Sequence, residues 1–361
     1  MINRECGVYK TTYQGDMGFY RVPLARWSMV VIAVLAIGVV PLVATDYWFR
    51  AIILPFVIFS LAAIGLNLLA GYCGQVSLGH GAFMAVGGYT SAILYAYDLP
   101  FILSMILGGV MAAVVGLLFG IPSVRVKGLY LALATLAAQF ALPWALSRTV
   151  PLFAPAGLAL AGGDTLKPPA LYIFGILIKS NTAQYYVCLA ILAVMTILAM
   201  NLVRTRVGRA WIAIRDHDVA ARILGYDITW YKLLAFAISS FYAGVAGSLM
   251  VFIYFGVAHI AEFSLNLSIE MLAVVIIGGM GSILGSFFGV AFIVFLPIFL
   301  NQLLTAIGSI GGFTISSGII SGTESLIFGS LIIMFLVIEP MGLAKLWANV
   351  RDYFRLWPFS Y

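Results

Sequence analysis

Long apolar runs, separated by short polar segments, dominate the chain. A helix needs about 20 apolar residues to cross the hydrocarbon core of a bilayer. Ten candidate spans meet or approach that length, at residues 28–44, 51–71, 82–97, 101–121, 129–147, 184–203, 233–256, 266–280, 284–304 and 325–343. The third and eighth are short and could be tilted, broken or re-entrant. The pattern predicts an all-α, polytopic integral membrane protein in which glycines break some of the helices.

The composition narrows the class further. Hydrophobic residues make up 63% of the 361 residues and charged residues 9%, against about 25% charged residues in ordinary soluble domains. These values exclude a water-soluble enzyme, a nucleic-acid-binding domain and a disordered protein. The 3 cysteines and 3 histidines are widely spaced, and no His-Glu-x-x-His sequence occurs. We therefore expect no disulfide framework, no metal site and no catalytic residues.

The basic residues indicate which side of the membrane each loop occupies. With an inward N-terminus, the inward segments hold 15 Lys and Arg residues and the outward segments hold 4. Such a bias places the basic loops in the cytoplasm. The polar stretch before the first apolar run does not fit a cleavable signal peptide, so that run is expected to remain as a span. Both termini are therefore expected on the cytoplasmic side of the membrane.

This topology divides the chain into a membrane domain with two long loops and two cytoplasmic ends. The ranges are an N-terminal segment at 1–27, the membrane domain at 28–345, a periplasmic loop at 148–183, a cytoplasmic loop at 204–232 and a C-terminal tail at 346–361. Prolines and glycines predict a mostly irregular periplasmic loop, with room for a short surface helix.

Two glycine-rich segments interrupt the apolar runs. The first extends from Gly71 to Gly81. Irregular backbone at membrane depth survives only where it is buried in protein or lines a watery cavity. In the second case Gln75, Ser77 and His80 would point into the cavity, whereas in a plain cytoplasmic turn they would be solvated.

The second segment, Gly278 to Gly285, opens with the same Gly-x-x-Gly spacing. Paired glycine-broken segments in the two halves of a chain indicate a transport pathway and an internal repeat. Glycine-rich helix packing is the alternative, since it is common in membrane proteins.

The inward loop 204–232 carries the densest charge in the chain. Its apolar positions form no single stripe, which predicts two short helices with a break near Asp216 to Asp218. Asp218 is placed to cap the second helix at its N-terminus, and Gly225 suits the C′ position. A short amphipathic helix between spans could lie in a groove on a cytosolic ATPase. The alternative is a basic loop that lies on anionic lipid.

Several motifs taken together resemble the LivM-type permeases of branched-chain amino acid ABC transporters. They occur in the family's order, as Asn67–Phe83, Gly87–Thr90, Arg125–Tyr130, Ala134–Leu136, Gly208–Gly225, Tyr231–Phe236, Gly278–Ser282 with Gly285, and Glu339–Leu343. Two positions depart from the family pattern. Ala161–Thr165 stands where the family usually has a Thr-Gly-Gly element, and Met341 stands where it usually has Arg.

The resemblance implies an ABC importer permease fold and a transport subunit rather than an enzyme. The implied partners are a second homologous permease subunit, two ATP-binding cassette subunits, a periplasmic substrate-binding protein and membrane lipid, with no nucleic acid. No Gly-x-x-x-x-Gly-Lys-Ser/Thr phosphate loop occurs in the chain. ATP would therefore bind to the partner subunits, and this chain would need no cofactor of its own. The implied solute is a branched-chain or other neutral amino acid, carried inward through the bacterial inner membrane.

Two sets of site residues follow from the motifs and the resemblance. The substrate pathway is expected at Gly74, Gln75, Ser77, Gly79, His80, Thr135, Gly278, Gly279 and Gly281. Coupling to the ATPase is expected at Arg209, Arg215, Asp216, Asp218, Ala220, Ala221 and Gly225.

Other functions remain open. Related permeases carry urea or short amides, and a secondary transporter or channel for a small polar solute would show the same spans. Ion-coupled carriers often bury a charge in the middle of a span, whereas Glu270, Glu324 and Glu339 lie near span ends. The predicted helix that ends at Gly225 favours the ABC permease, because a carrier or channel needs no helix that docks on an ATPase.

Overall fold

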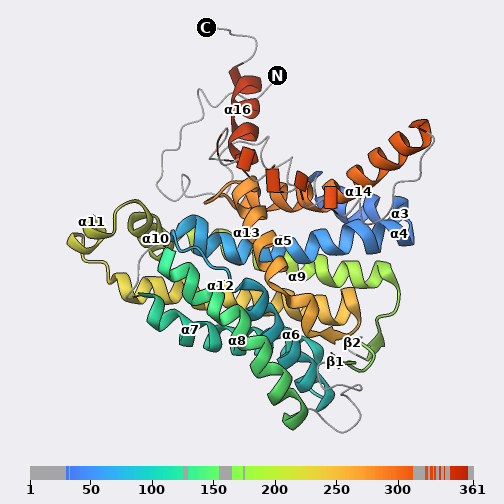
Figure 1. The fold of residues 1–361 in the computed structure, drawn as a ribbon, viewed down its shortest axis with the longest axis horizontal. Coiled ribbons are helices and arrows are strands. Elements are labelled where there is room, and N and C mark those ends of the chain that lie inside the picture. Colours follow the sequence, from blue (N-terminus) through green and yellow to red (C-terminus); the bar gives the residue numbers. More distant parts are fainter. Residues whose placement is uncertain are drawn as a thin grey trace.

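The computed structural model describes residues 30–31, 33–124, 129–153, 165–173, 175–311, 322–323, 326–327, 329–330, 333–334, 337 and 342–356. This part of the chain is almost entirely helical (Figure 1). Six of its helices are long and apolar enough to cross a membrane, namely Asp46–Tyr72, Phe101–Ile121, Tyr130–Phe153, Asn181–Arg204, Ile228–Phe255 and Ile283–Gln302. They coincide with six of the predicted spans.

The third and eighth predicted spans form helices that are too short for a simple crossing. α6 (His80–Ala96) has 17 residues and α13 (Leu265–Gly278) has 14, against the about 20 residues that the hydrocarbon core requires. The first predicted span is represented by η1 (Leu35–Val39) and α3 (Val40–Val43). Much of the tenth lies outside the described residues, so the total of ten spans stays a prediction.

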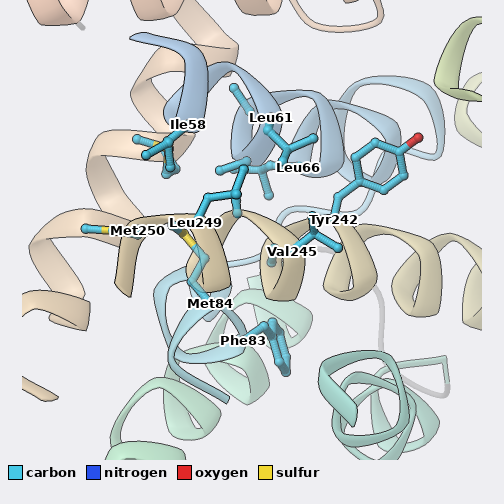
Figure 2. Close-up of a cluster of buried hydrophobic side chains, with 14 of the residues drawn as sticks. Ile58, Leu61, Leu66, Phe83, Met84, Tyr242, Val245, Leu249 and Met250 are labelled. Atoms are coloured by element: carbon cyan, nitrogen blue, oxygen red, sulfur yellow. The ribbon is translucent and has the colours of Figure 1, made fainter. Parts of the chain in front are cut away.

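Two long helical stretches form the centre of the bundle. The first joins α4 (Asp46–Trp48), the π-helix η2 (Phe49–Ile53), α5 (Leu54–Asn67) and the π-helix η3 (Leu68–Tyr72). The second joins α12 (Ile228–Leu249) to the π-helix η4 (Met250–Phe255). The apolar stretch of each is 83% buried within the chain. Figure 2 shows side chains of α5 and α12 packed together between the two stretches, with Phe83 of α6 on the other side of α12.

The other long helices surround this centre. They are α7 (Phe101–Val124), α8 (Leu129–Phe153), α9 (Asn181–Arg204) and α14 (Ile283–Gly311). The apolar stretch of α8 is only 28% buried and that of α9 only 22%. Small residues set the close contacts inside, since a Cβ on Gly87 of α6 would overlap the backbone of Gly244 in α12. Such contacts are the usual basis of helix packing in lipid, where apolar burial gives no drive for association.

The bundle has two ends, which we call the strand end and the Arg215 end. At the strand end, β1 (Thr165–Leu166) pairs with β4 (Ala258–His259), and the Tyr95 hydroxyl donates a hydrogen bond to the Ala170 carbonyl at 2.8 Å. At the Arg215 end lie α10 (Arg206–Asp216) and α11 (Asp218–Ile223), at the left in Figure 1. Segments of the predicted outward loops thus meet at the strand end, and segments of the predicted inward loops meet at the Arg215 end.

The predicted periplasmic loop contains short strands in its described part. Besides β1, a hairpin joins β2 (Tyr172–Ile173) to β3 (Ile176–Leu177). The 3-10 helix η5 (Ile260–Phe263) follows β4 and leads into α13. Residues 161–164, which include most of the departure from the family pattern, lie outside the described residues, as does Met341.

The predicted C-terminal tail includes most of a 15-residue helix, α16 (Gly342–Leu356). Its first residue lies against the loop after α13, since a Cβ on Gly342 would be 2.6 Å from the Gly279 nitrogen. Trp347 contacts Phe288 of α14, with ring centroids 5.8 Å apart. The C-terminal segment thus starts beside the second glycine-rich segment.

Candidate functional site

The first glycine-rich segment is unwound between η3 and α6. Residues Cys73 to Gly79 have extended or bent backbone, and Gly74 has a φ of 73°. Side chains alternate along this stretch, so that Gln75 and Ser77 are buried while Val76 is 40% exposed. We call residues 73–79 the unwound segment.

The unwound segment leads into the interior of the bundle, where α6 begins. The His80 Nε2 atom lies 3.0 Å from the Ala62 carbonyl oxygen, deep along α5. A helix start leaves backbone N–H groups without partners in the helix itself. Here the Ala82 N–H donates to Gln139 Oε1 at 2.9 Å and the Gly81 N–H donates to Ser268 Oγ at 2.8 Å. Side chains of α8 and α13 therefore cap α6 inside the protein.

Gln139 joins three elements at this point. Its Oε1 atom also accepts a hydrogen bond from Ser268 Oγ at 2.8 Å, and its Nε2 atom donates to the Phe263 carbonyl at 2.7 Å. One buried amide thus binds the start of α6, the start of α13 and the end of η5. Sequence reasoning missed Gln139, although an amide in an apolar run is a signal for a buried polar contact.

Thr135 lies directly against the unwound segment. Its hydroxyl oxygen accepts a hydrogen bond from the Leu78 N–H at 2.9 Å and donates to the Ala132 carbonyl at 3.0 Å. A Cβ on Gly79 would lie 2.7 Å from the Thr135 carbonyl oxygen. A side chain at residue 79 would therefore separate α8 from the unwound segment.

The polar side chains of the segment point into the protein. Gln75, Ser77 and His80 are at most 3% exposed. Gln75 Nε2 donates to the Lys232 carbonyl at 3.3 Å, and Ser77 Oγ accepts from the Gly79 N–H at 3.4 Å. The irregular backbone is thus supported by burial in protein, and its exposed edge consists of Gly74, Val76 and part of Leu78. A pathway role for the segment stays a prediction.

The second glycine-rich segment is a short turn at the Arg215 end. Gly278 is the last residue of α13, Gly279 follows as its C-cap, and Gly281 has a φ of 80°. A Cβ on Gly278 would overlap the carbonyl of Gly285 in α14. The glycines here allow α13 and α14 to pack closely on both sides of the turn.

Asn67 of α5 holds this turn. Its Oδ1 atom accepts a hydrogen bond from the Gly281 N–H at 2.8 Å, and its Nδ2 atom donates to the Ser282 carbonyl at 2.7 Å and to Ser286 Oγ at 2.8 Å. Three hydrogen bonds from one buried amide tie α5 to the turn between α13 and α14. Asn67 appeared in the sequence only as part of a family motif, and its partners lie more than 200 residues away.

The charged loop forms two short helices, as predicted. α10 begins at a Thr205 cap, whose Oγ1 accepts from the Val207 N–H at 3.2 Å. Trp211 is buried and its Nε1–H donates to the Tyr231 carbonyl at 2.9 Å. The break is at His217, where the backbone is extended.

One detail of that prediction was wrong by one position. His217 holds the N-cap position of α11, and Asp218 is the first residue of the helix. The extended backbone of a cap falls on His217, so the Asp218 carboxylate lies in the first turn, where a negative charge is still favoured. The C′ position of Gly225 is confirmed by its φ of 87° and by the hydrogen bond from its N–H to the Arg222 carbonyl.

α11 and its C-cap residue expose an apolar surface at the Arg215 end. Val219, Ile223 and Leu224 are 66%, 82% and 73% exposed, whereas Ala221 is buried against α10 and α12. Ala220 is also exposed, as is Arg209 on α10. Exposed apolar side chains that gather on one short helix are typical of a binding surface. We call Val219, Ile223 and Leu224 the α11 face.

Arg215 brings the two predicted sets of site residues together. Its Nη1 atom donates to the Gly71 carbonyl at 2.8 Å, and its Nη2 atom lies 3.1 Å from Asp216 Oδ1. A Cβ on Gly74 would be 3.0 Å from Arg215 Cγ, and one on Gly281 would be 2.9 Å from its Nη1. α10 thus contacts both glycine-rich segments through one side chain.

Within the described residues, His, Cys, Asp and Glu side chains form no group of three or more that could hold a metal ion. The predicted lack of a cofactor in this chain stays a prediction.

Comparison with known proteins identifies the family. A family model described as the permease component of a branched-chain amino acid transport system matches residues 49–338. The high-affinity branched-chain amino acid transport system permease protein LivM of Salmonella typhimurium is 32% identical over 250 residues, and LivM of Escherichia coli is 33% identical over 247 residues. Each alignment covers 62% of this chain and 57% of the relative, so the match spans little more than half of either LivM protein.

A probable ABC transporter permease protein, y4mJ of Sinorhizobium fredii, is 27% identical over 282 residues, which cover 76% of this chain and 78% of that protein. No solved structure shows a significant match. The family match extends over most of the chain, including all six long apolar helices except the first residues of Asp46–Tyr72. This multi-pass membrane protein therefore belongs to the family of branched-chain amino acid transport system permease components.

Proposed function

We propose that this chain is the membrane permease subunit of an ATP-driven importer of branched-chain or other neutral amino acids. The observation that carries the proposal is the family match over residues 49–338. Two relatives are named as LivM permeases of branched-chain amino acid transport systems, which supports the same solute class here.

We further propose that the Arg215 end faces the cytoplasm of a bacterium and the strand end faces the periplasm. The predicted distribution of 15 inward and 4 outward basic residues supports this direction. The proposal includes ten spans across the inner membrane, with both termini in the cytoplasm. The ranges 1–27 and 346–361 are then cytoplasmic, 28–345 is the permease domain, 148–183 is the periplasmic loop and 204–232 is the coupling loop.

The α11 face is the proposed docking surface for an ATP-binding subunit. An apolar surface on a short helix suits a groove in a soluble partner, and it lies at the end where ATP is available. The complex would contain a second homologous permease and two such subunits, with a periplasmic substrate-binding protein at the strand end. ATP would then bind and be hydrolysed on the partner chains.

The proposed pathway follows the exposed edge of the unwound segment. Gln75, Ser77, His80 and Thr135 would hold the backbone of that edge in place through their buried hydrogen bonds. Gly79, Gly278, Gly279 and Gly281 would allow the close packing that keeps the pathway narrow, while Gly74 lies on the exposed edge itself. This assignment separates residues that form the edge from residues that support it.

Uptake by whole cells tests the function. Cells that lack this chain should lose uptake of labelled leucine, isoleucine and valine at low external concentration, and the cloned chain should restore it. Loss of urea or short-amide uptake instead would assign the alternative solute class. Uptake that persists when cellular ATP is depleted but collapses when the ion gradients are abolished would assign a secondary transporter and contradict the proposal.

A further inference from the structure

Three segments that are far apart in the sequence meet at the guanidinium group of Arg215. They are the end of η3 at Gly71, the start of the unwound segment at Gly74 and the turn that contains Gly281. We propose that Arg215 is a positioning residue that transmits movement of α10 to both glycine-rich segments. This inference rests on the proposed function, because it presumes that α10 and α11 move with an ATPase.

The first argument is the space kept for this side chain. Gly74 and Gly281 both have positive φ, and a Cβ at either position would come within 3.0 Å of Arg215. The two glycines belong to different glycine-rich segments, separated by more than 200 residues. Each segment is therefore free of a side chain at the point where the same arginine passes.

The second argument is the kind of group that Arg215 binds. Gly71 lies in the last turn of the η3 π-helix, and the end of a helix leaves carbonyl groups without partners in the helix. A cation is favoured there because the carbonyl ends of the peptide dipoles point towards it. The hydrogen bond from Nη1 to the Gly71 carbonyl, at 2.8 Å, therefore connects α10 to the backbone of the central helix.

The third argument is that Asn67 makes the two glycine-rich segments one unit. Its hydrogen bonds to Gly281, Ser282 and Ser286 fix the turn between α13 and α14 to α5. A Cβ on Gly71 would overlap both Asn67 Oδ1 and the Gly281 nitrogen, so the end of η3 lies directly on the turn. A displacement that Arg215 applies to Gly71 would therefore reach both segments together.

The partial exposure of Arg215 allows its bond to break and form again. The side chain is 37% exposed and also contacts Asp216, its neighbour in α10, through Nε and Nη2. Water can replace the Gly71 carbonyl as partner without burying an unpaired charge, which would be costly. The bond to Gly71 is thus suited to a transport cycle in which α10 changes position.

The test compares substitutions at two arginines of the same helix in the purified, reconstituted transporter. Arg215→Met keeps the aliphatic stem and removes the guanidinium, while Arg206→Met does the same at an exposed position at the other end of α10. We expect Arg215→Met to keep ATP hydrolysis within about twofold while amino acid uptake per ATP falls by about 5- to 150-fold, the range of ordinary site-to-site coupling. Arg206→Met should keep the wild-type ratio.

Arg215→Lys distinguishes positioning from a simple structural role. Lysine retains a charged donor for the Gly71 carbonyl but lacks the several fixed N–H donors of the planar guanidinium. Uptake per ATP in Arg215→Lys should therefore lie between the values for Arg215→Met and the wild type. A purely structural residue would instead lower the thermal midpoint, the ATP hydrolysis and the uptake together. If Arg215→Met does not assemble, uptake per ATP is compared between Arg215→Lys and Arg206→Lys. The inference predicts a lower value for Arg215→Lys, and equal values would contradict it.

Failure of this inference and failure of the proposed function would give different results. A wild-type ratio of uptake to ATP hydrolysis in both Arg215 variants would overturn the inference and leave the proposed function in place. A wild-type complex that hydrolyses ATP without any amino acid uptake would overturn the proposed function itself.

Discussion

Each of the two central helices is followed by a break, meaning a non-helical stretch that leads into a shorter helix. The two breaks have the same order of elements but lie at opposite ends of the bundle. The first central helix ends in the π-helix η3, passes Gly74 at positive φ and continues through the unwound segment to α6. The second ends in the π-helix η4, passes Gly256 at positive φ and continues through residues 257–264 to α13. η3 ends at the Arg215 end, whereas η4 ends near β4 at the strand end.

The starts of α6 and α13 meet inside the bundle. The Gly81 N–H donates to Ser268 Oγ, and Gln139 binds both Ala82 and Phe263. The two Gly-x-x-Gly sequences suggested a repeat, but their backbone geometries differ. Gly278–Gly281 forms a tight turn, whereas Gly71–Gly74 leads into an extended segment. The more similar pair is the stretch after α5 and the stretch after α12.

The difference between the breaks lies in what contacts them from outside the bundle. The first receives Arg215 of α10, at the end proposed to face the ATPase. The second carries β4, which pairs with β1 from the long loop proposed to face the periplasm. The same order of elements therefore occurs at both ends of the bundle. At one end Arg215 contacts the break, and at the other end the β1–β4 strand pair does so.

The largest expected effect comes from Gly225→Pro, which changes only the Arg215 end. Proline fixes φ near about −65°, whereas Gly225 has a φ of 87° and donates its N–H to Arg222. We expect loss of transport and of ATPase stimulation with normal membrane insertion. Gly175→Pro is the matched control, because Gly175 has a φ of 81° in the β2–β3 hairpin at the strand end.

Copurification of ATP-binding subunits provides the readout for this pair. The subunits should be lost from Gly225→Pro and retained by Gly175→Pro. Normal uptake by Gly225→Pro would remove the coupling role from α11 and make the two ends equivalent.

Gly79→Leu tests the first break directly. A Cβ added to Gly79 would lie only 2.7 Å from the Thr135 carbonyl oxygen, so a leucine would force α8 away from the unwound segment. We expect transport to fall below detection in the uptake assay. Gly38→Leu is the control, since a Cβ there has no neighbour within 4 Å, and a wild-type rate for Gly79→Leu would show that the segment is no more than a turn.

Gln139→Leu tests the point where the breaks meet. It leaves the Ala82 N–H, the Phe263 carbonyl and Ser268 Oγ without their shared partner, and each buried unpaired group costs about 1–3 kcal/mol. We expect a lower thermal midpoint in detergent and a lower yield of folded protein. The exposed Gln302→Leu variant should resemble the wild type; an equal midpoint for both variants would contradict a supporting role for Gln139.

Thr135→Val should have the smallest effect. It removes the acceptor of the Leu78 N–H while keeping the shape of the side chain, and a hydrogen bond of this kind contributes about 1 kcal/mol. The thermal midpoint should fall by a few degrees at most. Thr149→Val on the same helix is the control, since its hydroxyl bonds only within α8 in the described structure; an equal fall in both variants would make the Leu78 contact incidental.

Apolar length and turn residues predicted much of this fold. Six long helices match the predicted spans, and the break at His217 and the C′ glycine at Gly225 follow from local chemistry that a sequence displays. Such features depend on neighbouring residues along the chain, so they are visible without a structure.

Depth and long-range partners could not be predicted in the same way. Periodicity does not show that α6 starts inside the bundle, because that depends on Gln139 and Ser268 from two other helices. Gln75 and His80 were expected either to point into a cavity or to be solvated in a turn, whereas the structure buries both side chains beside the Lys232 and Ala62 carbonyls. The role of Asn67 could not be predicted for the same reason, since its partners Gly281 and Ser282 lie in the other half of the chain.

Affinity purification of the tagged full chain from native membranes in mild detergent tests the central claim most directly. Identification of the copurifying proteins by mass spectrometry should reveal ATP-binding subunits and a second permease. A chain that purifies without them, across several detergents and salt concentrations, would contradict the account and indicate a carrier or channel whose α11 face lies on lipid.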